Sequence, residues 1–334
     1  MKKYLSTMKI TILRQYIRKM KMILKCLKCF SFQGGRRKME ILKGLDIKVK
    51  NSAVSLGKFD GVHRGHRLLL NGISERKDLV PTVFTFEMSD TPQKYIYSQD
   101  EKNKVLEEIG IAREVIFPFN EHTKNMAPEE FIEKFLVEKL DVKYICVGED
   151  FRFGRKREGN VGMLKKYASI YGYDIKIFHK LESDNEIISS TLVRKKLEDG
   201  DVVRANELLG RSYFIEGTVI HGNALGRTMN MPTANIIPEK SKLLLPSGVY
   251  ASKVMIEGDD MVYKGVTNIG RKPTIGRYDI GVETCLLDFD RDIYGKKIMV
   301  EFYERIRPEK KFPGLDELKN QMEADKAKVA RWQM

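Results

Sequence analysis

The chain has 334 residues, enough for about two domains that each bury a hydrophobic core. With 42% hydrophobic and 32% charged residues and no uninterrupted run of 18 apolar residues, the sequence excludes a helical membrane protein and predicts a globular one. The net charge of +14 raises nucleic acid as a partner, so the distribution of that charge matters.

The excess positive charge lies in the first 38 residues. This segment holds 12 Lys and Arg and no acidic residue, whereas the rest of the chain has 48 basic and 46 acidic side chains. Lysines interrupt its apolar residues, so it lacks a signal-peptide core. A membrane-surface helix and an RNA-binding tail remain open. We favour a third interpretation, because the GGRRK before Met39 is what a purine-rich ribosome-binding site would encode in frame. Translation is then expected to begin at Met39, with residues 1–38 a non-native or disordered leader.

The four cysteines form no disulfide framework. Cys26 and Cys29 make a single CxxC motif without a second pair or a preceding strand, and Cys146 and Cys285 stand alone. This use of cysteine is typical of a reducing compartment, so we expect a cytoplasmic protein with no membrane partner.

Residues 39–200 alternate between strand and helix patterns. We expect helices at residues 100–109, 127–140 and 160–171, and strands at residues 53–56, 79–86, 114–119, 142–147 and 173–178. This alternation predicts an α/β domain with a parallel sheet, helices on both faces, and ligands above the carboxyl ends of the strands.

Residues 57–66, GKFDGVHRGH, form the turn between the first strand and a helix whose pattern starts at Leu68. Such a turn points backbone N–H groups and the positive end of a helix dipole at the ligand edge, which favours a phosphate. His63 and His66 share one face of the first helical turn and can both donate to that anion, and Gly65 allows a nucleotide close to the backbone. Zinc ligation by HxxH lacks a third ligand nearby, and an ordinary surface pair of histidines also stays open.

Two more segments are expected at the same end of the sheet. GEDFRFG (148–154) combines Asp150 and Phe151 with glycines, which suits contact with a ribose or a planar ring; alternatively, Phe151 and Phe153 fill the core. ISSTLVR (188–194) begins a helix, where Ser190 and Thr191 are first of all capping residues. Arg194, about one turn in, would make a second phosphate site with these hydroxyls.

These three segments, in this order and spacing, resemble the FMN adenylyltransferase module of prokaryotic FAD synthetases, within the HxGH nucleotidyltransferase group. The resemblance implies a Rossmann-like fold and a reaction in which the FMN phosphate attacks the α-phosphorus of ATP, giving FAD and pyrophosphate. Residues 85–88 depart from the family, which usually has a Pro and often a His there. The implied residues are catalytic His63 and His66, ATP- or phosphate-binding Gly57, Phe59, Asp60, Gly65, Ser190, Thr191 and Arg194, and flavin- or nucleotide-contacting Asp150 and Phe151.

After residue 200 the pattern changes to strands without helices between them. A short helix at residues 201–209 precedes them, and an amphipathic helix at residues 314–332 is expected to pack outside. The period-two segments lie at residues 213–220, 248–256, 261–268, 279–289 and 296–303. They predict a small antiparallel β-barrel, so we expect two domains, residues 39–200 and 201–334.

The second domain has its own candidate site. Pro232 fixes the backbone ahead of Thr233 and Asn235, which are two residues apart, so their side chains project to the same side and offer neutral oxygen ligands to Mg²⁺. A polar hairpin without a ligand would have the same sequence pattern. Glu283 alternates in phase with Cys285, where an acid is costly to bury unless it lies at the barrel mouth, is salt-bridged, or acts as a base.

Residues 232–235 (PTAN), 265–274, 282–296 and 305–312 resemble riboflavin kinase, and both modules in this order are specific to the bifunctional riboflavin kinase/FMN adenylyltransferase family. The resemblance implies riboflavin, FMN and ATP as ligands, with Thr233 and Asn235 holding Mg²⁺ and ATP. Glu283 would be the catalytic base that takes the ribityl hydroxyl proton. Asn230, Met231 and Cys285 depart from the usual Gly-Phe and His of the family. Further implied ATP- or phosphate-binding residues are Gly222, Gly226 and Arg227.

Two other classes stay open. A cytidylyltransferase fused to a barrel of unknown ligand would share the first domain. A nucleic-acid-binding protein would need basic residues on a folded surface, and they lie in the leader, so no nucleic-acid partner is expected. The oligomeric state, including a homo-oligomer, is left open.

Overall fold

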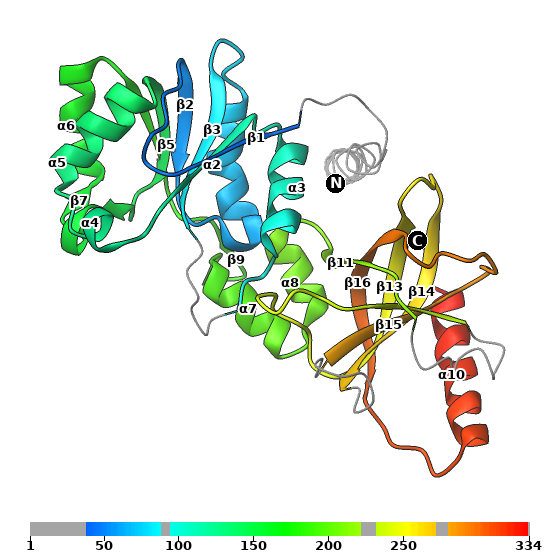
Figure 1. The fold of residues 1–334 in the computed structure, drawn as a ribbon. Coiled ribbons are helices and arrows are strands. Elements are labelled where there is room, and N and C mark those ends of the chain that lie inside the picture. The colour runs from blue at the N-terminus through cyan, green and yellow to red at the C-terminus, as the bar shows by residue number, and fades with distance from the viewer. Residues whose placement is uncertain (1–37, 88–93, 222–231, 272–279, 333–334) are drawn as a thin grey trace, which may run out of the picture.

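The structure is a computed structural model that describes residues 38–87, 94–221, 232–271 and 280–332. The chain folds into two units, a parallel α/β unit and then a curled antiparallel sheet with one helix against it (Figure 1). Within these residues, no helix has the length and apolar character needed to cross a membrane.

The α/β unit is built on a six-stranded sheet in the order β1-β4-β3-β2-β5-β8, and all neighbouring strands are parallel. Its strands are β1 (Glu40–Lys43), β2 (Ser52–Leu56), β3 (Val80–Phe86), β4 (Arg113–Phe117), β5 (Val142–Gly148) and β8 (Asp174–Phe178). The strand order reverses between β2 and β5, which is where ligands bind in open α/β sheets.

Helices cover both faces of this sheet. The first face packs against α2 (Arg64–Ser74) and α3 (Gln99–Ile109), and the second against η2 (Phe131–Lys139) and α6 (Val161–Tyr171). Neighbouring Ala53 and Val54 of β2 enter different hydrophobic clusters, as alternation along a strand requires. The short elements of this unit are η1 (Asp60–Val62), α4 (Glu121–Lys124), α5 (Pro128–Glu130), η3 (Arg155–Arg157), α7 (Ser190–Glu198), and the hairpins β6 (Arg152–Phe153) with β7 (Gly159–Asn160) and β9 (Glu182–Ser183) with β10 (Glu186–Ile187).

The predicted alternation of strands and helices is confirmed, with three local differences. Helix α2 begins at Arg64 rather than Leu68, because His63 caps it. Strand β1 was not predicted, since its four residues are mostly exposed at the sheet edge and give no alternating pattern. The helix predicted at residues 127–140 is divided into α5 and the wider, π-type η2.

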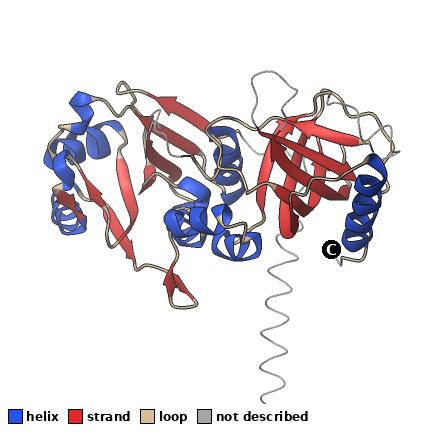
Figure 2. Cartoon of the chain, turned by 90° about the horizontal axis from the view of Figure 1, so that it is seen from below, coloured by secondary structure: helices blue, strands red, loops and turns tan. Residues whose placement is uncertain are grey.

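The antiparallel unit is a six-stranded sheet in the order β11-β16-β13-β14-β15-β12. The sheet curls until Ile220, beyond the end of β11, donates its N–H to Asn235 O of β12 at 2.8 Å. Helix α10 (Leu315–Ala330) packs on the outside, on the side away from the parallel sheet (Figure 2). The strands are β11 (Tyr213–Thr218), β12 (Thr233–Ile236), β13 (Gly248–Ile256), β14 (Val262–Arg271), β15 (Ile280–Leu286) and β16 (Lys297–Pro308), and α8 (Val202–Leu209) precedes them.

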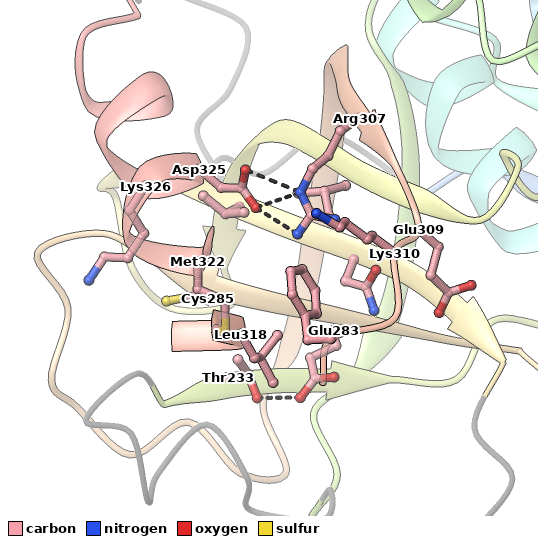
Figure 3. A pocket seen from close by; sticks show the side chains of 14 residues that line it. Thr233, Glu283, Cys285, Arg307, Glu309, Lys310, Leu318, Met322, Asp325 and Lys326 are labelled. Atoms are coloured by element: carbon pink, nitrogen blue, oxygen red, sulfur yellow. Dashed lines mark hydrogen bonds and ion pairs between the residues drawn. The ribbon is translucent and has the colours of Figure 1, made fainter. Parts of the chain in front are cut away.

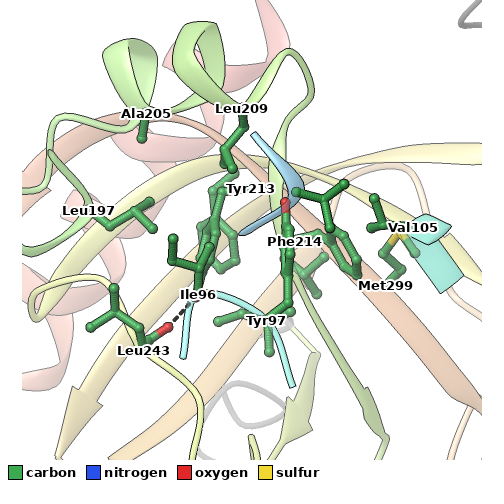
Figure 4. Packing of buried hydrophobic residues seen from close by; sticks show 14 of the residues in the cluster. Ile96, Tyr97, Val105, Leu197, Ala205, Leu209, Tyr213, Phe214, Leu243 and Met299 are labelled. Atoms are coloured by element: carbon green, nitrogen blue, oxygen red, sulfur yellow. Dashed lines mark hydrogen bonds between the residues drawn. The ribbon is translucent and has the colours of Figure 1, made fainter. Parts of the chain in front are cut away.

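The predicted barrel with its outer helix is therefore confirmed as a curled, partly closed sheet. Strand β12 was not predicted as a strand, because its four residues are too few to show a period. The two units also share one hydrophobic cluster, which includes Val105 and Tyr97 of the first and Tyr213 and Phe214 of the second (Figure 4). They are consequently packed together through apolar contacts.

Candidate active sites

The first candidate site is the turn between β2 and α2. Its backbone takes a left-handed conformation at Phe59 (φ 50°) and Gly61 (φ 78°), which turns the chain sharply after the strand. His63 then caps α2, and its Nδ1 accepts the N–H of His66 at 3.3 Å. The cap fixes the imidazole at the helix N-terminus, where backbone N–H groups favour an anion.

The two histidines of the turn are stacked, with ring centroids 3.7 Å apart. Because Nδ1 of His63 is an acceptor, the neutral ring carries its proton on Nε2. Burial lowers the pKa of His63 from 6.5 to about 4, and burial with the neighbouring His63 holds the pKa of His66 well below its usual value. Both rings are thus neutral near pH 7 and act as hydrogen-bond donors, and a bound anion would raise both pKa values.

A cavity of about 300 Å³ opens over this turn. Residues that follow β2, β5 and β8 line it, so it lies at the reversal of strand order. Among the residues predicted for this site, those that line the cavity are Gly57, Phe59, His63, Gly65, His66, Asp150, Phe151 and Ser190.

The structure places Asp60, Thr191 and Arg194 differently. The buried Asp60 does not line the cavity; its Oδ2 accepts Nη2 of Arg194 at 2.6 Å, and its backbone carbonyl accepts the Ser190 hydroxyl at 2.8 Å. Thr191 is exposed outside the cavity, and Ser189 is the residue that caps α7. Asp60 therefore holds the start of α7 against the turn.

In the GEDFRFG segment (148–154), one phenylalanine fills the core and the other faces the cavity, so each of the two interpretations from the sequence holds for one residue. Phe153 is buried in the core, whereas Phe151 lines the cavity. Asp150 forms an ion pair with Lys180 at 2.9 Å. Lys180 and His179 were not predicted, although their position directly after β8 gives a signal for the same edge.

The second candidate site is the face of the curled sheet where β12 pairs with β15. Asn235 lies opposite Glu283 and Thr233 opposite Cys285, so their side chains share one face. Thr233 Oγ1 donates to Glu283 Oε1 at 2.7 Å (Figure 3). The structure thus brings together the three residues that the sequence singled out in this unit.

Two cavities meet at Thr233. One, of about 320 Å³, lies between the sheet and α10 and includes Glu283 and Cys285 in its lining (Figure 3). The other, of about 390 Å³, lies toward the segment that ends at Tyr294. Thr233 lines both, so two ligands could approach each other beside Glu283.

The first of these cavities contains residues that sequence reasoning missed. Arg307 forms a bidentate ion pair with Asp325 of α10, with Nη2 to Oδ2 at 2.8 Å, and this pair joins the helix to β16 at the cavity wall. Asn268 also lines the cavity and pairs with Glu283 across β14 and β15. Asn268 and Arg307 lie in the segments 265–274 and 305–312, which resemble riboflavin kinase, but the sequence assigned them no role, and Asp325 lies outside every motif; the pairing of distant strands and α10 brings the three together in one wall.

Comparisons with known proteins cover both units. A family model described as FAD synthetase matches residues 46–192, and one described as riboflavin kinase matches residues 209–333. The bifunctional riboflavin kinase/FMN adenylyltransferase of Haemophilus influenzae is 36% identical over 302 residues, covering 86% of this chain and 97% of the relative. That of Bacillus subtilis is 36% identical over 295 residues, covering 84% and 92%.

The chain belongs to the bifunctional riboflavin kinase/FMN adenylyltransferase family. A crystal structure titled as a macrolide-efflux protein from Streptococcus pneumoniae has the same fold, with a TM-score of 0.79 and 29% identity, and covers 88% of this chain and 100% of that one. Within this family, the parallel unit is the FAD synthetase part and the curled sheet is the riboflavin kinase part.

Some predicted residues lie outside the described part of the chain. These are Gly222, Gly226 and Arg227, the departures Asn230, Met231 and Met88, and the CxxC cysteines Cys26 and Cys29. Among residues 38–87, 94–221, 232–271 and 280–332, no group of three or more His, Cys, Asp or Glu could hold a metal ion.

Proposed function

We propose that the chain phosphorylates riboflavin to FMN with ATP at the Thr233–Glu283 site and adenylylates FMN to FAD at the His63–His66 site. The main support is that each of the two segments matched by a family model has its own cavity, and that side chains of the motifs in that segment line this cavity. We further propose the division into functional domains at residues 39–200 and 201–334, with riboflavin, FMN and ATP as ligands.

In adenylyl transfer, the FMN phosphate attacks the α-phosphorus of ATP and pyrophosphate leaves. The nucleophile is already anionic and needs no base. We assign His63 and His66 to hydrogen bonding with the phosphates and the leaving pyrophosphate, where charge develops. Asp60 acts indirectly, because it holds Arg194 and Ser190 beside the turn. Phe151 and Asp150 in the cavity wall suit contact with the flavin or the nucleotide.

In the kinase reaction, Glu283 takes the proton of the ribityl hydroxyl while that oxygen attacks the γ-phosphorus of ATP; the bond from this phosphorus to the bridging oxygen breaks, and ADP leaves. The position of Glu283 beside Thr233, where two cavities meet, supports riboflavin in one cavity and ATP in the other. The Arg307–Asp325 pair would keep α10 against the riboflavin side.

The residues of this site fit Mg²⁺. Thr233 and Asn235 lie on one face next to the Glu283 carboxylate, and hydroxyl, amide and carboxylate oxygens are the ligands Mg²⁺ accepts; Thr233 lines both cavities, whereas Asn235 is buried behind it and lines neither. When bound with ATP, Mg²⁺ would supply positive charge to the phosphate oxygens. Thr233 and Asn235 would hold it, while Glu283 orients the Thr233 hydroxyl.

Purified protein with riboflavin, ATP and Mg²⁺, followed by chromatography of the products, tests this proposal. FMN should appear first and FAD next, and chelation of Mg²⁺ should stop FMN formation. His66→Ala should lower FAD formation by about 10² to 10³, the usual cost of one lost donor to developing charge, and leave FMN formation intact. His122→Ala is the matched control, because His122 is exposed and does not line the cavity. Absence of both products with wild-type protein, or equal loss of both in His66→Ala, would refute the assignment.

A further inference from the structure

A buried lysine of the riboflavin kinase part reaches into the FAD synthetase part. The side chain of Lys242, between β12 and β13, is 1% exposed and pairs with Glu101 of α3, which is 3% exposed. Its Nζ also donates to the backbone carbonyl of Ile96 at 3.1 Å. The rings of Tyr97 and Tyr213 face the ammonium at 4.9 and 4.6 Å. A buried ammonium is costly unless its partners are well placed, so this position calls for an explanation beyond apolar packing.

Ile96, whose backbone carbonyl accepts from Lys242, is in direct contact with the turn between β2 and α2, here called the phosphate turn. Ile96 donates its N–H to Asp60 Oδ1 at 2.9 Å, and Asp60 in turn accepts from Arg194 and Ser190. The Ile96 side chain also packs on Gly61, where a Cβ would lie only 2.7 Å from Ile96 Cδ1. Hydrogen bonds therefore link Lys242 to the carbonyl of Ile96, the N–H of Ile96 to the Asp60 carboxylate, and the backbone carbonyl of Asp60 to Ser190 in the cavity wall, with the residues Ile96 and Asp60 as the covalent connections.

The segment around Ile96 is held mainly by the other unit. Tyr95 N–H donates to Ser241 O at 2.8 Å, and Leu243 N–H donates to Tyr95 O at 2.7 Å. The Tyr213 hydroxyl donates to Leu243 O, which fixes the Leu243 side of this contact (Figure 4). Lys242 thus stands in the middle of a short strand-like pairing between the units, and its side chain is the link that reaches the Asp60 partner.

Glu101 also bonds to Lys242, but its other hydrogen-bond partners are not those of Ile96 and Asp60. Its carboxylate accepts the N–H groups of Ser98 and Glu216, both at 2.9 Å, in addition to Lys242. It therefore caps α3 and fastens that helix to β11, without touching Asp60. The ion pair of Lys242 with Glu101 can therefore be removed and tested separately from the hydrogen bond of Lys242 to Ile96, which leads to the turn.

We propose that Lys242 is a positioning residue for FMN adenylylation. From the kinase part, it fixes the backbone of Ile96 so that Asp60 holds Ser190 and Arg194 in register with His63 and His66. The inference rests on the proposed function of that site. The competing explanation is a purely structural staple, in which Lys242 only stabilises the contact between the units.

Lys242→Met tests the proposal, because Met keeps an apolar stem among the aromatic rings and removes only the ammonium. We expect the kcat/KM for conversion of FMN to FAD to fall roughly ten- to a hundredfold, the scale of a small misplacement of reacting groups. The rate of riboflavin phosphorylation should stay within about twofold of wild type, since neither Thr233 nor Glu283 takes part in the hydrogen bonds that link Lys242 to Ser190.

The double variant Lys242→Met/Glu101→Gln separates positioning from stability. Removing both charges relieves the unpaired buried carboxylate, so the melting temperature should recover toward wild type. The loss of FAD formation should persist, because the bond to Ile96 is still missing. Lys104→Met is the matched control: it breaks another ion pair between the units, Lys104–Glu216, without touching Ile96, and should leave both activities unchanged.

Recovery of FAD formation together with the melting temperature in the double variant would overturn the proposal and support the staple. A wild-type rate of FAD formation in Lys242→Met would overturn it as well, as would a loss of the same size in Lys104→Met. These outcomes differ from failure of the proposed function, which would appear as no FAD from the wild-type protein.

Discussion

Glu283→Gln is the sharpest test of the kinase assignment. The substitution keeps the side-chain volume and one oxygen that can accept the Thr233 hydroxyl, now 2.7 Å from Glu283 Oε1. It exchanges a charge-assisted hydrogen bond of about 1.5–3 kcal/mol for a neutral one of about 0.5–1.5 kcal/mol. The expected loss of stability is therefore about 1–1.5 kcal/mol, or a few degrees in melting temperature.

The expected effect on the reaction is much larger. A general base contributes about 10²–10⁴ in rate, so riboflavin phosphorylation should slow at least about a hundredfold, equivalent to ~2.7 kcal/mol in the barrier. Affinity for riboflavin should change little, and FMN supplied directly should become FAD at the wild-type rate. Thermal melting, equilibrium binding and separate assays of the two steps measure these three effects.

Glu304→Gln is the matched control for a glutamate with a structural role. Glu304 forms an ion pair with Lys328 of α10 at 2.9 Å and is half exposed. Its substitution should cost less than about 1 kcal/mol and leave the kinase rate unchanged. Wild-type phosphorylation by Glu283→Gln would refute the base assignment, and a large fall in its melting temperature would show that Glu283 is structural.

Two further predictions concern the phosphate turn. Burial keeps the folded-state pKa of His63 at about 4 against 6.5, so below pH 6.5 the unfolded chain takes up a proton that the folded site refuses. The contribution of His63 to the unfolding free energy should fall by about 3 kcal/mol between pH 6.5 and pH 4, since each pH unit of this gap is worth ~1.4 kcal/mol, and His66 adds a loss in the same direction. His63→Asn, which keeps a capping oxygen but does not titrate, should make the pH dependence of stability shallower in denaturant titrations, and an unchanged slope would contradict the cause. Gly65→Ala should lower FAD formation about tenfold or more, because the new Cβ would lie 3.2 Å from the His63 ring, which must shift away from its place as the cap of α2; unchanged FAD kinetics would show that the His63 orientation is not critical.

The sequence by itself determined the two architectures and pointed to the segments that form the two candidate sites. Alternation of strand and helix patterns in the first unit and period-two strands in the second are local signals, and they predicted the parallel sheet and the curled antiparallel sheet correctly. The turn with His63 and His66 could be placed at a strand end because strand, glycine and helix follow one another directly along the chain. Thr233 and Asn235 could be assigned to one side because residues two apart in an extended chain face alike.

Only the tertiary structure decided which partners these residues have. Asp60 was expected at the ligand, but it accepts from Arg194, 134 positions away, and holds α7 in place. Lys242 carries no motif, and its contact with Glu101, 141 positions away, arises because the two units pack on one hydrophobic cluster. Such contacts depend on how complete elements dock, whereas hydrophobic periodicity and turn chemistry act over only a few residues.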